Sequence, residues 1–315
     1  MDNKRKIFFF GASVTHQSGD SGYYSKISIN ERYDFNRLSF PSSQLFNAGF
    51  FNVHKIFEMD TIHDIIFLEW STTGENSYEL HTLKYIVGII LKNNAHPVFL
   101  ILPTHQNLVS RNSENLLFKV GVEWGVPVLD LRYKHESILI DCLRDGVHTN
   151  ENGANLYANW ILDFLDGFDY SSKPTFVNDE SSKYIISSLT SKFLMMKGNV
   201  LELEFLKINH TSEISIIHRV GPFSPILEYY SDNDDLIWEK EFLDPWCRYE
   251  RENFTTLIPN QILSKTNRMV RIKISDKLPD YSKVLKYEEK FLGERVMKLE
   301  SLYFCNLTDV SVKIS

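Results

Sequence analysis

Four short, uninterrupted apolar runs recur through the first half of the chain, and they constrain its fold more than any other feature. The runs cover residues 7–10, 65–68, 98–102 and 126–129. A strand that reads as a continuous apolar run is covered on both faces, which is the property of strands in parallel sheets. Between the runs, the sequence predicts helices over residues 78–92, 113–124 and 151–165. The alternation of strand and helix therefore predicts a three-layer α/β/α sandwich with a parallel sheet.

The pattern changes in the second half of the chain, where apolar and polar residues begin to alternate. Segments over residues 201–205, 270–274 and 310–314 each show this alternation. A period of two over several short segments is typical of antiparallel strands with one face in water. We therefore predict two domains: an α/β domain over residues 1–174 and a mostly antiparallel, β-sandwich-like domain over residues 175–315.

The composition argues against several classes of function. The chain has 315 residues, a net charge of −7 and no long stripe of Lys and Arg, so we expect no nucleic-acid partner. The apolar stretch at residues 7–10 is too short for a signal peptide or a membrane span, and we expect a cytoplasmic protein. The three cysteines, Cys142, Cys247 and Cys305, lie far apart and predict free thiols. The ten histidines show no HxH or HExxH spacing, so we predict no bound metal.

A serine follows the first predicted strand directly. The segment Gly11-Ala12-Ser13-Val14-Thr15 begins where the first apolar run ends. Because the carboxyl ends of parallel strands open onto the ligand crevice of an α/β sheet, a turn of small residues there presents a serine hydroxyl with little steric hindrance. The serine still needs a base within hydrogen-bond reach and donors for the oxyanion. Taken alone, this turn is better explained as an ordinary connection between a strand and a loop.

An aspartate and a histidine lie just before the last predicted helix of the same domain. In Asp145-Gly146-Val147-His148 the two side chains can face the same side, so that the carboxylate fixes the tautomer of the imidazole. The other ring nitrogen can then accept the serine proton, and Thr149 is expected to cap the following helix. An isolated DxxH is more often a solvated turn with a surface histidine. Together with the serine turn, however, it predicts a triad of Ser13, Asp145 and His148.

These segments resemble the SGNH, or GDSL-like, hydrolases, a family of esterases, lipases, and carbohydrate acetylesterases and acetyltransferases. Residues 11–17 with Gly22-Tyr23 resemble the nucleophile block of its carbohydrate-acting branches. Phe46-Asn47-Ala48-Gly49 resembles a second block whose glycine amide donates to the oxyanion. Residues 64–71 are similar to the strand that leads into the third block, and Asp145 to His148 match the last block. The resemblance covers about the first half of the chain. It implies an SGNH-like fold with the amides of Ser13 and Gly49 in the oxyanion hole.

Two positions depart from the pattern of this family. Ala12 stands where the family often has an aspartate, which is not the nucleophile. The third block normally supplies an asparagine whose amide completes the oxyanion hole, and that position falls near Thr73. We therefore expect Thr73 or Asn76 as the third donor. The loss of one such donor typically costs ~2.7–4 kcal/mol of transition-state stabilisation.

Three functions are compatible with these residues. The resemblance implies a serine-dependent carboxylic-ester hydrolase that acts through an acyl-enzyme, needs no cofactor, and removes a small acyl group such as acetyl from a carbohydrate or another small ester. An O-acetyltransferase with the same triad, which moves acetyl from a donor such as acetyl-CoA to a glycan hydroxyl, is the first alternative. A non-catalytic glycan-binding protein on a decayed hydrolase fold is the second. The acyl chain, the glycan and the oligomeric state stay open.

Other side chains that could carry chemistry are predicted to be structural. Glu69 and Glu75 could form a glycosidase pair, but nothing in the sequence places them on opposite sides of a sugar. Aromatic residues of the second domain, such as Tyr229-Tyr230, or Trp246 with Tyr249, could stack on sugar rings. Packing in a core explains them more readily.

Overall fold

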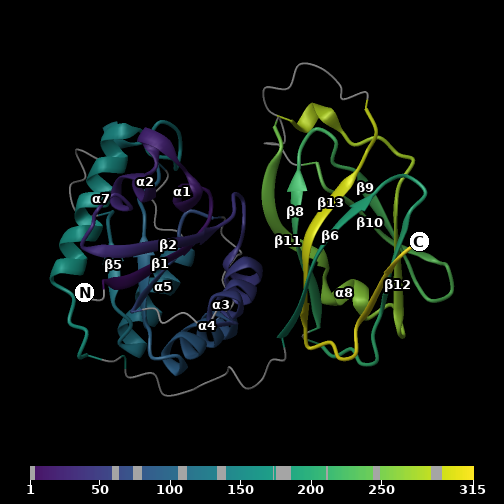
Figure 1. Ribbon diagram of the computed structural model, residues 1–315, viewed down its shortest axis with the longest axis horizontal. Coiled ribbons are helices and arrows are strands. Elements are labelled where there is room, and N and C mark those ends of the chain that lie inside the picture. Colours follow the sequence, from purple (N-terminus) through teal and green to yellow (C-terminus); the bar gives the residue numbers. More distant parts are fainter. Residues whose placement is uncertain are drawn as a thin grey trace. The chain divides into compact units, whose positions relative to one another are not determined.

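The computed structural model describes most of the chain, as two compact units. The described residues are 4–58, 64–73, 80–105, 112–132, 140–172, 174, 186–210, 212–243, 249–284 and 293–315. The units comprise Met1–Lys183 and Tyr184–Ser315. The first holds a parallel sheet with helices and the second holds antiparallel sheets, in agreement with the predicted fold class (Figure 1). The domain boundary predicted after residue 174 adjoins residues 175–185, which lie outside the described part.

The first unit is built on a five-stranded parallel sheet with the strand order β2-β1-β3-β4-β5. Its strands are β1 (Arg5–Gly11), β2 (Tyr33–Ser39), β3 (Ile65–Glu69), β4 (His96–Ile101) and β5 (Val128–Asp130). Its helices are α1 (Ser13–His16), α2 (Tyr23–Ile27), α3 (Phe50–Glu58), α4 (Leu80–Lys92), α5 (Asn112–Trp124) and α7 (Glu151–Asp166). Single helical turns lie at Gly19–Ser21, Leu45–Gly49 and Ile140–Cys142.

The four predicted strands correspond to β1, β3, β4 and β5, and the three predicted helices correspond to α4, α5 and α7. Strand β2 is not predicted from the sequence, because it lies at the edge of the sheet, pairs with β1 alone, and carries Asp34, Asn36 and Arg37 between its apolar residues. Helices α1 and α2 are not predicted either. Helices of four and five residues are too short to show a helical period.

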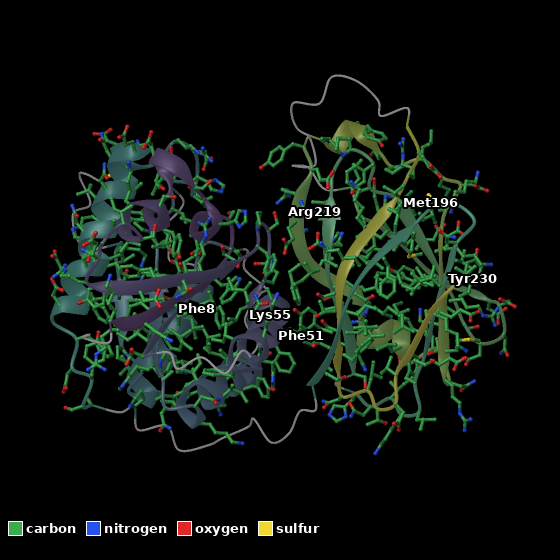
Figure 2. The ribbon with its side chains drawn as sticks, viewed as in Figure 1. Phe8, Phe51, Lys55, Met196, Arg219 and Tyr230 are labelled. Atoms are coloured by element: carbon green, nitrogen blue, oxygen red, sulfur yellow. The ribbon has the colours of Figure 1, made fainter. Side chains whose placement is uncertain are left out.

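Helices cover both faces of the parallel sheet. Ile7 and Phe9 of β1 pack in one cluster with residues of α1, α2 and α7. On the opposite face, a Cβ added at Gly121 of α5 would lie 2.3 Å from Val128 Cγ2 and 3.5 Å from Phe99 Cδ2. Figure 2 shows the side chains of this unit, among them the buried Phe8 of β1. Because successive strand residues point to opposite faces, two covered faces account for the uninterrupted apolar runs.

The second unit consists of two antiparallel sheets that share one apolar core. One sheet has the order β10-β9-β12-β7-β14, and the other has the order β11-β8-β13-β6. The strands are β6 (Ile186–Met195), β7 (Val200–Glu204), β8 (Glu213–Val220), β9 (Ile226–Tyr230), β10 (Leu236–Glu241), β11 (Arg251–Ile258), β12 (Met269–Ile274), β13 (Met297–Cys305) and β14 (Ser311–Ile314), with helix α8 (Asn260–Leu263). The three segments predicted from their alternation correspond to β7, β12 and β14. The buried Tyr229 belongs to the shared core, as predicted, whereas Tyr249 is 56% exposed, so the packing predicted for Tyr249 is wrong.

Helix α7 packs tightly against the turn that precedes the DxxH loop. A Cβ added at Gly153 would lie 2.2 Å from Cys142 O. Asn150 caps the helix, because its side chain accepts the N–H of Gly153 at 3.0 Å. The predicted cap at Thr149 is wrong by one residue, since the Thr149 hydroxyl donates instead to Ser21 O at 2.6 Å. The start of α7 thus fixes one end of the loop that carries the predicted aspartate and histidine.

We predict that Gly153→Ala destabilises the protein, although alanine has a higher helix propensity than glycine. The added methyl group would meet the carbonyl oxygen of Cys142 at 2.2 Å, and overpacking of this kind costs about 1–3 kcal/mol. Gly167→Ala is the matched control, because the nearest atom to a Cβ there lies 3.7 Å away. Urea denaturation measures both variants. Equal midpoints for the two variants would contradict the close packing of α7.

Candidate active site

The carboxyl ends of β1, β3 and β4 bring the candidate residues to one edge of the parallel sheet. Ser13 follows β1 by two residues, and Glu69 is the last residue of β3. Beyond β4, the backbone N–H of His105 donates to Gly146 O at 2.9 Å, so the DxxH loop is anchored to the same edge. In a parallel sheet this edge is where ligands bind.

Ser13 is the first residue of α1 and is partly buried. The N–H of the first residue of a helix has no acceptor within that helix, so the Ser13 amide can donate to a ligand. Within the described residues, Ser13 Oγ makes no hydrogen bond to His148. In known enzymes, catalytic hydrogen bonds are often long or poorly aligned without substrate and tighten when substrate binds.

The loop from Cys142 to Asn150 closes on itself through backbone hydrogen bonds. Arg144 N–H donates to His148 O, and Asn150 N–H donates to Cys142 O, both at 2.9 Å. Two nested bonds of this kind leave the loop little freedom to open. The residues between Arg144 and His148 therefore form a tight turn whose shape is set by the backbone.

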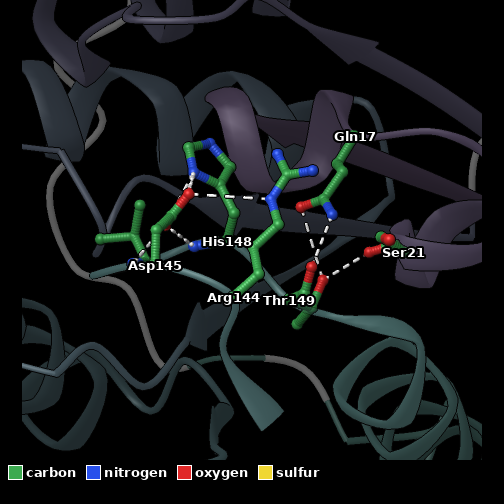
Figure 3. Close-up of polar contacts among 7 residues, drawn as sticks. Gln17, Ser21, Arg144, Asp145, His148 and Thr149 are labelled. Carbon is green, nitrogen blue, oxygen red and sulfur yellow. Dashed lines mark hydrogen bonds and ion pairs between the residues drawn. The ribbon is translucent and has the colours of Figure 1, made fainter.

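Asp145 and His148 form a hydrogen-bonded pair inside this turn (Figure 3). His148 Nδ1 lies 3.1 Å from Asp145 Oδ1 and 3.0 Å from Oδ2. Asp145 Oδ1 also accepts the backbone N–H groups of Val147 at 3.0 Å and His148 at 2.8 Å. Aspartate favours such turns because its side chain accepts N–H groups that follow it in the chain. The predicted pairing of these two residues is therefore present in the structure.

The surroundings of Asp145 keep its carboxylate ionised. Partial burial acts to raise the pKa of Asp145, but the backbone N–H groups of His148 and Val147, together with the His148 ring, outweigh it and leave the pKa below its ordinary value. An ionised carboxylate can only accept, so the proton of a neutral His148 ring lies on Nδ1. Nε2 then carries a free lone pair. This is the arrangement that a general base requires.

Gln17 joins the serine segment to the histidine loop. Its backbone N–H donates to Ser13 O at 3.0 Å. Its side-chain amide donates to Thr149 O at 2.8 Å, across 132 residues of sequence (Figure 3). Because Thr149 directly follows His148, these bonds bring the helical turn that carries Ser13 next to the loop that carries His148.

The expected oxyanion donors lie in three segments. Gly49 ends the helical turn Leu45–Gly49, and a Cβ added there would lie 2.8 Å from Leu45 Cδ1. Thr73 is buried, and its hydroxyl donates to Trp70 O at 3.0 Å, so its proton already has an acceptor. Asn76 lies outside the described residues. Thr73 or Asn76 as the third donor stays a prediction, as do the amides of Ser13 and Gly49.

Glu69 lies at the same edge of the sheet, and the sequence does not predict its burial or its hydrogen-bond partners. It is 0% exposed, and its carboxylate accepts hydrogen bonds from Thr15, Thr72 and the backbone of Ala12. Burial raises the pKa of Glu69 to about 7, and these hydrogen bonds oppose the shift. The sequence does hold one indication, because Glu69 directly ends an apolar strand at the ligand-binding edge of the sheet.

Three other features were considered in the described part of the chain: a metal site, a membrane-spanning helix and the cysteines. No three side chains of the His, Cys, Asp and Glu types are arranged there to hold a metal ion. No helix in the same residues has the length and apolar character needed to cross a membrane. Cys142 and Cys305 are buried and form no disulfide, and Cys247 lies outside the described residues.

Comparisons with known proteins find similar structures but no family. No family model matches the chain, and no curated protein matches its sequence. Its structure is similar to that of an acetyl xylan esterase, with 15% identity, a TM-score of 0.41, and coverage of 51% of this chain and 99% of that chain. It is also similar to a putative lipolytic protein of the G-D-S-L family from Desulfitobacterium hafniense, with 12% identity, a TM-score of 0.39, and coverage of 50% and 98%. A third similar structure is an SGNH-hydrolase family esterase, with 12% identity, a TM-score of 0.36, and coverage of 53% and 97%. The chemistry proposed below rests on this chain's own residues.

We predict that Glu69 lowers the stability of the folded protein as the pH rises. In the unfolded chain Glu69 ionises from about pH 4.5, whereas the folded protein keeps its proton until about pH 7. Stability is therefore lost between these two values, by about 3 kcal/mol at ~1.36 kcal/mol per unit of pKa. Urea denaturation at several pH values measures this loss as the difference between wild type and Glu69→Gln.

The control for this prediction is Glu123→Gln, which replaces an exposed carboxylate on α5. Its stability should follow that of the wild type across the same pH range. A constant difference between wild type and Glu69→Gln from pH 4.5 to pH 8 would contradict the raised pKa of Glu69.

Proposed function

We propose that this protein is a serine-dependent carboxylic-ester hydrolase with an SGNH-like α/β domain, in which Ser13, Asp145 and His148 form the catalytic triad. The pairing of His148 Nδ1 with the Asp145 carboxylate carries this proposal, because it leaves Nε2 as a base at the edge of the sheet where Ser13 lies. The bond from Gln17 to Thr149 supports it by joining the two segments. A solvated surface turn would need neither feature.

The proposed reaction begins with the attack of Ser13 Oγ on the ester carbonyl carbon. His148 Nε2 takes the hydroxyl proton, and Asp145 stabilises the imidazolium that results. The tetrahedral intermediate collapses by breaking the bond to the leaving alcohol, which receives the proton from His148. Water, activated by the same histidine, then attacks the acyl group on Ser13. The acid is released, and the serine regains its proton.

The oxyanion of each tetrahedral intermediate needs donors that already point at it. We assign the backbone amides of Ser13 and Gly49 to this role, with Thr73 or Asn76 as the third donor. The Ser13 amide suits the role because it begins α1, where no acceptor within the helix competes for it. For Thr73 to serve through its hydroxyl, its bond to Trp70 O must be exchanged for one to the substrate.

We propose that the substrate is a carbohydrate or another small ester that carries a short acyl group, such as acetyl. We also propose that the protein is cytoplasmic. The choice of substrate follows the resemblance of residues 11–17 to the nucleophile block of carbohydrate-acting SGNH enzymes. The same triad would also serve an O-acetyltransferase, in which a glycan hydroxyl replaces water. Incubation with radiolabelled acetyl-CoA and a glycan acceptor separates the two, since only the transferase places label on the glycan.

We predict that a fluorophosphonate probe labels the wild type and that the wild type hydrolyses p-nitrophenyl acetate. Ser13→Ala and His148→Ala should lose the labelling and about 10³–10⁶-fold in kcat, because one removes the nucleophile and the other its base. Asp145→Asn should lose up to about 10⁴-fold through the wrong tautomer of His148.

Ser18→Ala is the control for these variants, since Ser18 is exposed, lies close to Ser13 in the chain, and makes no capping hydrogen bond with its side chain. It should label and turn over as the wild type does. A wild type that neither labels nor hydrolyses the ester would refute the catalytic proposal and favour a glycan-binding protein.

A further inference from the structure

One buried carboxylate contacts the nucleophile turn on both sides of Ser13. Glu69 Oε2 accepts the backbone N–H of Ala12 at 3.3 Å and the hydroxyl of Thr15 at 2.8 Å. Ala12 precedes the serine directly, and Thr15 follows it by two residues. Glu69 therefore fixes the backbone on both sides of Ser13, while the amide and hydroxyl of Ser13 take no part in this network.

The other oxygen of the same carboxylate contacts the loop that follows β3. Glu69 Oε1 accepts the hydroxyl of Thr72 at 3.0 Å, and the Thr72 backbone N–H also donates to the carboxylate. Thr72 directly precedes Thr73, in the segment expected to supply the third oxyanion donor. A single side chain thus links two of the three segments assigned to the oxyanion hole.

The structure makes room for this carboxylate at the end of β1. A Cβ added at Gly11 would lie 2.7 Å from Glu69 Oε2 and 2.3 Å from Thr15 Oγ1. Only glycine allows so close an approach. Burial of an ionisable group is unfavourable, and an apolar side chain would fill the same space without that penalty. Packing alone therefore does not account for a glutamate at this position.

Further polar groups lie around Glu69. Tyr23 OH lies 2.7 Å from Thr15 Oγ1 and extends the network to α2. Arg37 of β2 donates to the backbone oxygens of Thr15 and Gln17. Burial first, then the Cys142 thiol and the Glu69 charge, raise the pKa of Tyr157 of α7. Within the described residues, no cation forms an ion pair with Glu69. Its ionised form therefore depends on the donors from the two segments that it links.

We infer that Glu69 is a positioning residue, which fixes the Ser13 turn and the loop after β3 in the geometry that stabilises the oxyanion. The inference rests on the proposed function. In this role, Glu69 affects the rate of the chemical step and not the binding of substrate. It also predicts that the ionised carboxylate, which accepts every donor around it, is the form that supports the reaction.

The experiment compares Glu69→Gln, Thr15→Val and Thr15→Ser with the wild type, using p-nitrophenyl acetate and fluorophosphonate labelling. Glu69→Gln and Thr15→Val should lower kcat by about 10–100-fold, less than the loss of a direct oxyanion donor, with KM within about twofold of the wild type. Thr15→Ser keeps the hydroxyl and should restore most of the rate. The valine and serine variants separate the hydrogen bond from the shape of the side chain.

The pH dependence of kcat/KM is the readout that a structural role would not change. In the wild type, protonation of Glu69 should reduce the rate below about pH 7. Glu69→Gln lacks this ionisation, so its acid limb should fall less steeply than that of the wild type. Glu114→Gln is the control. Glu114 lies on α5, is as buried as Glu69, and pairs with Arg132, which follows β5. It should lose stability and keep its kcat.

The outcomes separate this inference from the proposed function. If Glu69→Gln is folded by circular dichroism and has the kcat and pH profile of the wild type, Glu69 is structural and the triad still stands. If Glu69→Gln does not fold, equal rates for Thr15→Val and Thr15→Ser overturn the inference. A wild type with neither labelling nor turnover overturns the proposed function, and this inference with it.

Discussion

The loop from Cys142 to Asn150 is closed by two backbone hydrogen bonds, and the candidate site depends on that closure. The closed loop holds the Asp145 carboxylate against the ring of His148, so the side chains need no distant support to stay paired. The close packing of Gly153 against Cys142 then ties the loop to α7. The geometry of the Asp145–His148 pair is therefore encoded within a few consecutive residues.

The side of the site that carries Ser13, the proposed nucleophile, is built in the opposite way, from residues far apart in sequence. The parallel sheet brings the ends of β1 and β3 together, and Glu69 contacts the turn that carries Ser13. Because burial raises the pKa of Glu69 to about 7, stability is lost as the pH rises from about 4.5 to about 7. The positioning role inferred for Glu69 therefore comes with a loss of stability, as is common at functional sites.

The sequence predicts most of the fold because covered strands and long amphipathic helices have clear periods. It does not predict β2, whose polar edge residues break the pattern, or the cap at Asn150, since the neighbouring Thr149 is also of a residue type that caps helices. At the site, the pairing of Asp145 with His148 is local and could be predicted. The burial of Glu69 could not, because it follows from the packing of α1 and the loop after β3 over the end of that strand.

The most direct test of a serine nucleophile is the capture of the acyl-enzyme. The protein is mixed with p-nitrophenyl acetate, quenched in acid within the first turnovers, and digested with trypsin, which releases the peptide between Lys6 and Lys26. The account predicts that this peptide carries one acetyl group on Ser13 by mass spectrometry, and that Asp145→Asn slows its formation. Turnover of the ester with no acetyl group on Ser13, or with the group on another residue, would contradict the account.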